Sequence, residues 1–447
     1  VDAVRALPDR DGPALLSGQE RLSRRNLLDA VERRRPDLPP AAVAVRTGLP
    51  LTAVVDLLAA QASGAVPVVL AGEAGGPSAD GSRTGPARLG RSLSAARRRR
   101  AAEPWLALPT SGSTGTPRLV VRSCRSWACS LDAFTEVSGI TGDDLVLATG
   151  PLSSTMTLFA VWHALATGVP VLAPGRWRGV MAAGPAAPAA TVAHAVPTVL
   201  GDLLDGVTTG ALPRLRRVVV AGAATPPGLR RRAGELGVRL VEYYGAAELS
   251  FVAADRDGTG LRAFPGAELD VRDGLVTARS PYLADGYLDG ADPGPLRRDA
   301  DGWACVGDRG LLVDGVLTVL GRGDAAVTVG GETVLVCDVE AALREVPGVR
   351  DVACAGIPHP RLGELLVAVV EPEPDQASAA SPTTSLTASP TAVRAAVRAA
   401  AREHLRPAAR PVRVLVGELP RSPGGKVDRS ALRARFGERP APADPRG

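Results

Sequence analysis

A run of small hydroxyl residues and glycines between Thr110 and Arg118 is the part of this sequence best suited to chemistry. These nine residues read TSGSTGTPR and contain five hydroxyl groups, two glycines, one proline and a terminal cation. Glycine lacks a Cβ atom, so the backbone of such a loop can approach a ligand closely. Successive N–H groups and hydroxyls can then converge on an anion, which predicts a phosphate-binding cradle. Its candidate contacts are Thr110, Ser111, Gly112, Ser113, Thr114, Gly115 and Arg118.

This cradle differs from the common P-loop, because no Lys-Ser or Lys-Thr pair follows its second glycine. A cluster of Ser, Gly and Thr is also typical of a solvated surface loop, and the loop alone does not decide between the two interpretations. The apolar run 105–108 precedes it and predicts a strand that delivers the loop to a sheet.

Helical and strand patterns alternate through the first half of the chain, which predicts an α/β fold with largely parallel sheets. The predicted helices are 22–34, 51–62, 156–167, 191–204 and 226–236, and the predicted strands are 65–70, 144–148, 170–173, 217–221 and 239–244. Ligands bind at the carboxyl ends of strands in such sheets. Gly222 and Glu248 both follow predicted strands and are expected at that edge.

The pattern changes after about residue 260 to short strands and Gly/Asp turns, which predicts a small β-subdomain. A glycine-rich stretch at 321–324 marks the expected boundary, followed by a strand pair, two helices and two longer strands. We therefore expect a large N-terminal domain at 1–320 and a small α+β C-terminal domain at 321–447.

Composition excludes several classes of protein. The 447 residues are 45% hydrophobic and 22% charged, and the net charge of +5 is small for this length. The arginine run 97–100 lacks stacking aromatics, so we expect a solvated linker and no nucleic-acid partner. Five cysteines show no metal-ligand spacing, and no apolar run reaches the roughly 18 residues of a membrane span. The sequence thus predicts a cytoplasmic protein without membrane insertion.

Five motifs occur in a fixed order along the chain. They read LPTSGSTGTPR (108–118), VEYYGAAELS (241–250), DGWACVGDRG (301–310), GRGDAAVTVGGETV (321–334) and LPRSPGGKVDRSAL (419–432). This series resembles the acyl-adenylate-forming superfamily of acyl-CoA synthetases, aryl-acid ligases, firefly luciferase and stand-alone adenylation domains. The resemblance spans about 51–432 and implies a large N-terminal domain, a small mobile C-terminal domain and an active site in the cleft between them.

The resemblance implies ATP and Mg²⁺ as cofactors, and as acyl acceptor either CoA or the phosphopantetheine of a carrier protein. It assigns Glu248 to Mg²⁺ and catalysis, and Asp308 to the ribose hydroxyls. Arg322 is assigned to the ribose and phosphate. The nucleotide slot would be lined by Gly222, Ala223, Tyr243, Tyr244 and Gly245.

In the C-terminal part, the same resemblance assigns Lys426 to the transition state, where its charge would meet the attacking carboxylate and the α-phosphate. Asp324 would be the hinge for domain rotation between the two half-reactions. Taken singly, each of these residues also has an ordinary structural interpretation, such as a turn aspartate or a solvated lysine. Their order along the chain favours the functional one.

Several positions depart from the superfamily pattern. Arg118 replaces the usual Lys, Ala247 replaces a Thr or Ser that donates to the α-phosphate, Thr328 stands where Lys is frequent, and 150–154 lacks a common histidine. These losses keep open a third hypothesis, a nucleotide-binding relative without catalysis, beside the CoA ligase and the carrier-loading enzyme.

The substrate is expected to be a small carboxylic acid without an α-amino group. The stretch 151–160 contains no acidic residue, so a substrate ammonium would be buried without a counter-charge at a high cost. Candidate wall residues of the acid pocket are Ser153, Ser154, Thr155 and Met156. The hydroxyls of Ser153, Ser154 and Thr155 favour an aryl or functionalised acid over a long fatty chain.

Overall fold

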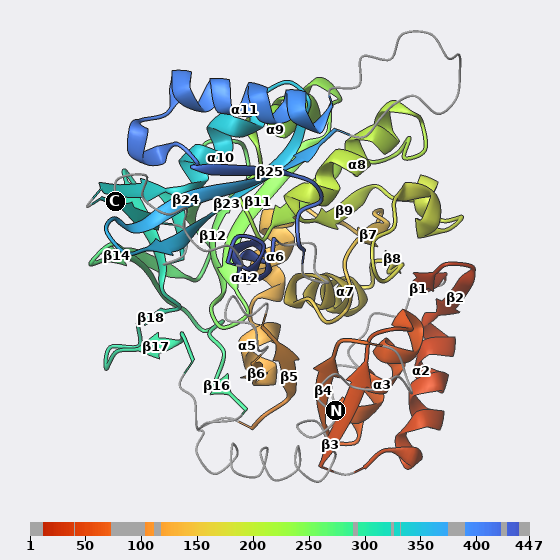
Figure 1. Cartoon of the computed structure of the whole chain (residues 1–447). Helices are drawn as coiled ribbons and strands as arrows, with labels where there is room; N and C mark the ends of the chain where they lie inside the picture. The colour runs from red at the N-terminus through yellow and green to blue at the C-terminus, as the bar shows by residue number, and fades with distance from the viewer. Residues whose placement is uncertain are drawn as a thin grey trace, which may run out of the picture.

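The computed structural model describes residues 12–39, 41–72, 103–110, 118–288, 294–322, 326–330, 332–373, 389–421 and 427–437. These residues form sheets of nine, six, five and five strands with helices packed on their faces, so the predicted α/β class is confirmed (Figure 1). Within the same residues, no helix has both the length and the apolar character needed to cross a membrane.

The nine-stranded sheet has the order β13-β12-β11-β10-β9-β7-β8-β1-β2 and a parallel centre from β11 to β8. Its strands are β1 (Pro13–Ser17), β2 (Glu20–Ser23), β7 (Val146–Ala148), β8 (Val171–Leu172), β9 (Val192–Ala195), β10 (Arg217–Ala221), β11 (Arg239–Ala246), β12 (Ser250–Asp255) and β13 (Arg262–Ala263). Helix α7 (Thr155–Thr167) packs on one face, whereas α8 (Pro197–Thr208) and α9 (Pro227–Glu235) cover the other.

A five-stranded sheet with the order β16-β6-β5-β4-β3 shares the core of the α7 face. Its strands are β3 (Ala42–Arg46), β4 (Val66–Leu70), β5 (Leu106–Pro109), β6 (Leu119–Arg122) and β16 (Gly286–Tyr287). Helices α2 (Arg24–Arg34) and α3 (Pro50–Ala62) pack together near β1 and β3, and α5 (Cys124–Ala128) and α6 (Leu131–Ser138) follow β6. Strand β16 comes from far along the chain and covers the outer edge of β6.

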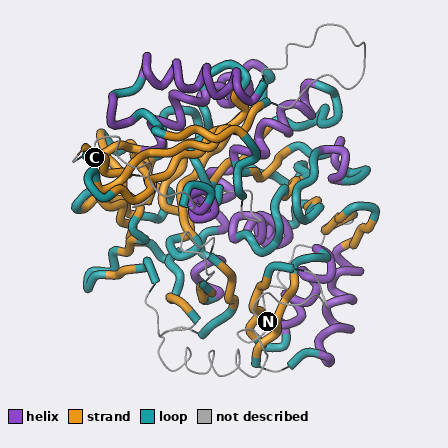
Figure 2. Tube along the Cα trace, in the orientation of Figure 1, coloured by secondary structure: helices purple, strands orange, loops and turns teal. Residues whose placement is uncertain are grey.

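The predicted small β-subdomain is a six-stranded sheet. It contains β14 (Glu268–Arg272), β15 (Leu275–Arg279), β17 (Arg297–Arg298), β18 (Ala304–Cys305), β19 (Asp308–Val313) and β20 (Val316–Arg322). The last sheet contains β21 (Ala326–Val329), β22 (Glu332–Leu335), β23 (Val349–His359), β24 (Gly363–Pro372) and β25 (Arg413–Val416). Helices α10 (Val336–Arg344) and α11 (Pro390–His404) cover one face of that sheet, and α12 (Arg429–Ala434) covers the other. In the view of Figure 1 and Figure 2, α11 lies above β23, β24 and β25 of the last sheet.

One predicted element is wrong. The stretch 191–204 is not a single helix but strand β9 followed by helix α8, which begins at Pro197. Proline is tolerated in the first turn of a helix and breaks its interior, so the helix begins where the prediction placed an interior residue. The preceding residues pair with β7 and β10 and are fully buried.

Two histidines lie inside the aromatic part of the core. His163 and His194 are 0% and 1% exposed. The ring of His163 packs edge-on against Phe134 and that of His194 is stacked with it, with centroid distances of 4.9 and 5.8 Å. His163 Nε2 lies 2.8 Å from Thr135 Oγ1, whereas neither ring nitrogen of His194 has a hydrogen-bond partner within the described structure. Burial lowers the pKa of His163 to about 4 and that of His194 to about 3.

The free energy of unfolding should therefore fall as the pH drops from 7 to 5. Unfolded histidines bind protons below a pKa of about 6.5, while these two stay neutral in the folded protein, so protons favour the unfolded chain over that interval. The expected loss is on the order of 2 kcal/mol for each histidine. Urea unfolding at a series of pH values measures it, and His194→Leu should remove about half of the pH dependence. An unchanged pH dependence in that variant would contradict the assignment.

Candidate active site

The residues predicted to line the nucleotide slot meet where two neighbouring parallel strands end. Ala221, the last residue of β10, pairs with Tyr243 on β11. Gly222 follows directly with φ of +96°, a left-handed conformation that favours glycine and turns the chain away from the sheet. Ala223 is exposed beyond it. This edge is the carboxyl end of the parallel strands, as the sequence predicted.

Asp308 lies beside this edge although it is far away in the sequence. The hydroxyl of Tyr244 donates a hydrogen bond of 2.7 Å to Asp308 Oδ2, and Asp308 is only 8% exposed. Asp308 begins β19, whose backbone pairs there with Arg322, the last residue of β20; the Arg322 side chain lies outside the described structure. The hydrogen bond between Tyr244 and Asp308 thus connects the nine-stranded sheet with the six-stranded sheet, and both residues are predicted to bind the nucleotide.

Glu248 lies in the tight turn between β11 and β12. The turn is closed by a hydrogen bond from Leu249 N to Ala246 O, and the Glu248 side chain is nearly buried, with 3% exposure. A buried carboxylate next to a nucleotide edge suits a hard cation such as Mg²⁺. Among the described residues, no group of three His, Cys, Asp or Glu side chains could hold a metal. Coordination of Mg²⁺ by Glu248 stays a prediction.

Gly245 makes this turn possible, because β11 carries a bulge between Tyr244 and Gly245 where it meets β12. A Cβ atom at Gly245 would lie 1.9 Å from the carbonyl oxygen of Ser250. Only glycine allows this approach without a shift of the backbone.

Gly245→Ala should therefore lower the free energy of unfolding by about 1–3 kcal/mol and displace the turn that bears Glu248. Gly234→Ala is the matched control, because a Cβ at this exposed position in α9 meets no atom within 4 Å and alanine favours helix. Urea unfolding of both variants measures the difference. Equal stability of the two variants would contradict this explanation.

The segment predicted to form the phosphate cradle connects the antiparallel strands β5 and β6. Thr110 N donates to Arg118 O at 2.8 Å, and Arg118 N donates to Thr110 Oγ1 at 3.3 Å, so the two ends of the loop are joined. The predicted contacts Ser111, Gly112, Ser113, Thr114 and Gly115 lie outside the described residues. The hairpin is antiparallel, so β5 and β6 both support the same loop.

Arg122 is a residue that the sequence analysis missed. It is 0% exposed, and its guanidinium donates to Ala247 O at 2.7 Å and to Tyr282 O at 2.8 Å. Burial lowers the pKa of Arg122 to about 10, while the nearby carboxylates of Asp285 and Glu248 oppose this shift. Arg122 therefore ties the strand after the phosphate cradle to the Glu248 turn. The only sequence signal was a cation ending the apolar strand 119–122.

The candidate wall residues of the acid pocket form the start of helix α7. Ser153, Ser154, Thr155 and Met156 are all half-buried, and Ser154 is the N-cap residue although its hydroxyl makes no capping bond. Thr157, one residue further, is 1% exposed, and its Oγ1 has no hydrogen-bond partner in the described part of the chain. Their contact with a substrate stays a prediction.

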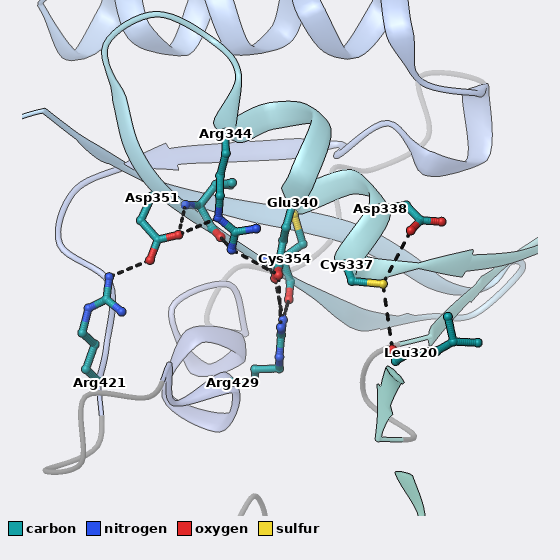
Figure 3. A network of polar contacts seen from close by, with 10 residues as sticks. Leu320, Cys337, Asp338, Glu340, Arg344, Asp351, Cys354, Arg421 and Arg429 are labelled. Atoms are coloured by element: carbon teal, nitrogen blue, oxygen red, sulfur yellow. Dashed lines mark hydrogen bonds and ion pairs between the residues drawn. The ribbon is translucent and has the colours of Figure 1, made fainter. Parts of the chain in front are cut away.

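Lys426 and the hinge candidate Asp324 both lie outside the described residues. The chain on either side of Lys426 is nevertheless firmly anchored (Figure 3). Arg421 donates to Asp351 Oδ2 at 2.8 Å, and Arg429 donates to Glu340 Oε1 at 2.8 Å. Burial favours a higher pKa for Asp351, but the guanidiniums of Arg344 and Arg421 outweigh it and keep that pKa below its usual value.

The backbone closes the same region. Arg421 and Val427 form an antiparallel bridge, and Asp428 N donates to Pro420 O at 2.7 Å. The two ends of the segment that carries Lys426 are therefore held together and fixed to the C-terminal sheet.

Comparisons with solved structures agree with this fold. ATP-bound MatB from Rhodopseudomonas palustris has a TM-score of 0.77 at 21% sequence identity, and the match covers 98% of both chains. The anthranilate CoA ligase AuaEII in complex with anthranoyl-AMP has a TM-score of 0.78 at 19% identity, covering 97% of this chain and 96% of that one. At these identities the likeness establishes the fold, including the small C-terminal domain.

Among curated proteins, a salicylyl-CoA synthase / salicylate adenylyltransferase from Streptomyces sp is 32% identical over 359 residues, which are 73% of this chain and 62% of that protein. A probable 2-succinylbenzoate–CoA ligase from Mycobacterium tuberculosis is 37% identical over 175 residues, 38% of this chain and 43% of that protein. The matches thus span about half the length of these relatives.

Family models match two parts of the sequence. The model of the AMP-binding enzyme matches residues 42–288, more than half of the chain, and the model of the AMP-binding enzyme C-terminal domain matches residues 338–426. This chain therefore belongs to the AMP-binding enzyme family.

Proposed function

We propose that this chain is an AMP-forming acid–thiol ligase that uses ATP and Mg²⁺ to convert a carboxylic acid into its CoA thioester. The observation that supports the proposal is the Tyr244–Asp308 hydrogen bond, which lies beside the carboxyl ends of β10 and β11, where ligands bind in parallel sheets. Glu248 lies in the turn that ends β11. The names of the relatives, which include CoA ligases and a salicylate adenylyltransferase, support the same reaction.

In the first half-reaction, a carboxylate oxygen attacks the α-phosphorus of ATP, the bond to the β-phosphate oxygen breaks, and pyrophosphate leaves. In the second, the thiolate sulfur attacks the acyl carbon and AMP leaves, the thiol proton having passed to solvent. Asp308 would accept hydrogen bonds from the ribose hydroxyls, and Thr110 and Arg118 would contact the leaving phosphates. Glu248 would ligate Mg²⁺, which supplies positive charge to the phosphates.

We also propose that the chain divides at about residue 321 and that the C-terminal part rotates about Asp324 between the half-reactions. The six-stranded sheet ends with β20 at Arg322, and a separate sheet begins with β21 at Ala326. Lys426 belongs to this second part and is the only lysine in the sequence. The other basic side chains are arginine and four histidines, so this position holds a cation of a distinct kind.

The proposed substrate is a small aryl or functionalised acid without an α-amino group. The pocket stretch 151–160 has no acidic residue, and the salicylate and anthranilate enzymes in the comparisons act on aryl acids by name. Cytoplasmic location and the choice between CoA and a carrier protein stay predictions.

Acid-dependent ATP–pyrophosphate exchange across a set of aryl acids tests the proposal, followed by thioester formation with CoA. Exchange and CoA thioester with at least one acid are expected. Exchange with loading of a phosphopantetheinyl carrier but no CoA thioester would favour the carrier-loading enzyme. Tight ATP binding without any acid-dependent exchange would favour the non-catalytic nucleotide binder, which Ala247 in place of a hydroxyl donor suggests.

A further inference from the structure

The phenol of Tyr287 contacts the carboxylate that we propose as the Mg²⁺ ligand. Its hydroxyl donates a hydrogen bond of 2.8 Å to Glu248 Oε1, and the two side chains are 7% and 3% exposed. The backbone N–H of Leu296 donates to the same phenol oxygen at 3.3 Å. In the contact with Leu296 the backbone N–H is the donor, so the phenol oxygen accepts there. The single phenol proton is therefore donated to Glu248.

The ring of Tyr287 is held in place from several sides. On β16, Tyr287 pairs with Val120 of β6, and its ring packs against Val120 and Ala284. Gly294 lies so close that a Cβ there would be 2.4 Å from the ring. A phenol is protonated at neutral pH, so this hydroxyl has a proton to donate.

The backbone of the Glu248 turn is fixed independently of the side chain. Ala284 N donates to Glu248 O at 2.8 Å, and Arg122 donates to the preceding carbonyl of Ala247. With its main chain held in this way, the remaining freedom of Glu248 lies in its side-chain torsions. The hydrogen bond from Tyr287 restricts those torsions at the carboxylate itself.

We propose that Tyr287 is a positioning residue that orients the Glu248 carboxylate toward the Mg²⁺ of the bound nucleotide. By occupying Oε1, the phenol leaves the second carboxylate oxygen for the metal. Tyr287 pairs with Val120 of β6, the strand that begins directly after Arg118. The inference rests on the proposed function, since it assumes that Glu248 is a metal ligand.

The test is a Mn²⁺ titration of the protein–ATP complex followed by electron paramagnetic resonance, with no acid present so that no turnover occurs. Tyr287→Phe keeps the ring and removes the hydroxyl, and it should weaken Mn²⁺ binding about ten- to a hundredfold. Tyr282→Phe is the matched control, because that buried phenol donates to the Pro265 carbonyl at 2.7 Å and should leave Mn²⁺ affinity unchanged.

A double-mutant cycle with Glu248→Gln separates positioning from general loss of structure. Glu248→Gln should weaken Mn²⁺ binding, and adding Tyr287→Phe to it should cause no further loss. A Tyr287→Phe affinity within twofold of wild type, or a full additional loss in the Glu248→Gln background, would overturn the inference. Failure of the wild-type protein–ATP complex to bind Mn²⁺ would instead count against the proposed function.

Discussion

Lys426→Ala should lower acid-dependent ATP–pyrophosphate exchange by about a hundredfold or more. A preorganised charge at the reacting phosphate is worth on the order of 3 kcal/mol of transition-state stabilisation. The same variant, given a chemically made acyl-adenylate, should transfer the acyl group to the thiol at nearly the wild-type rate. Under the proposed rotation about Asp324, Lys426 has left the site before the thiol enters.

Lys426 is the only lysine in the sequence, so no other lysine of this chain can replace it in the variant. Lys426→Arg keeps the charge but replaces a compact ammonium by a planar guanidinium, so partial recovery of exchange would separate charge from geometry. Arg398→Ala, at an exposed position on α11, is the control and should change neither half-reaction. If Lys426→Ala slows both half-reactions equally, the lysine acts through domain docking or folding and its assigned role is wrong.

Arg122→Met should lower the free energy of unfolding by about 3–5 kcal/mol. The substitution removes the donors to the carbonyls of Ala247 and Tyr282. It also removes a fully buried positive charge near the Glu248 and Asp285 carboxylates. Methionine keeps much of the side-chain length. The loss of stability is therefore expected to come mainly from the missing guanidinium contacts and less from a cavity. Urea unfolding at pH 7 measures the change.

Arg125→Met is the control for this experiment. Arg125 lies three residues further in α5 and is exposed, so its removal should change stability by no more than about 0.5 kcal/mol. Arg122→Lys should recover only part of the loss, since an ammonium group does not reproduce the two guanidinium donors that reach separate carbonyls. A loss below about 1 kcal/mol for Arg122→Met would show that this buried cation is not essential for stability.

Most of the parallel sheet was predictable because its signals are local. The run that became β10 is a short apolar stretch, and Gly222 after it marks the point where the chain leaves the sheet. The run that became β11 is apolar and aromatic apart from Arg239 and Glu242. The placement of Gly222 and Tyr244 at one edge follows from the geometry of parallel strands. The wrong helix at 191–204 arose where the same apolar pattern suits a buried strand or a helix, and pairing with β7 and β10 decided between them.

The sequence by itself determined the family, the fold class and the order of the motifs. Only the tertiary structure decided which of those residues meet. Tyr244 reaches Asp308 across 64 positions of sequence, and Tyr287 reaches Glu248 across 39. Periodicity describes contacts within one element, whereas these bonds depend on how separate sheets pack and on which side chains share a buried space. The burial of Arg122, a residue type that sequence patterns place at the surface, has the same origin.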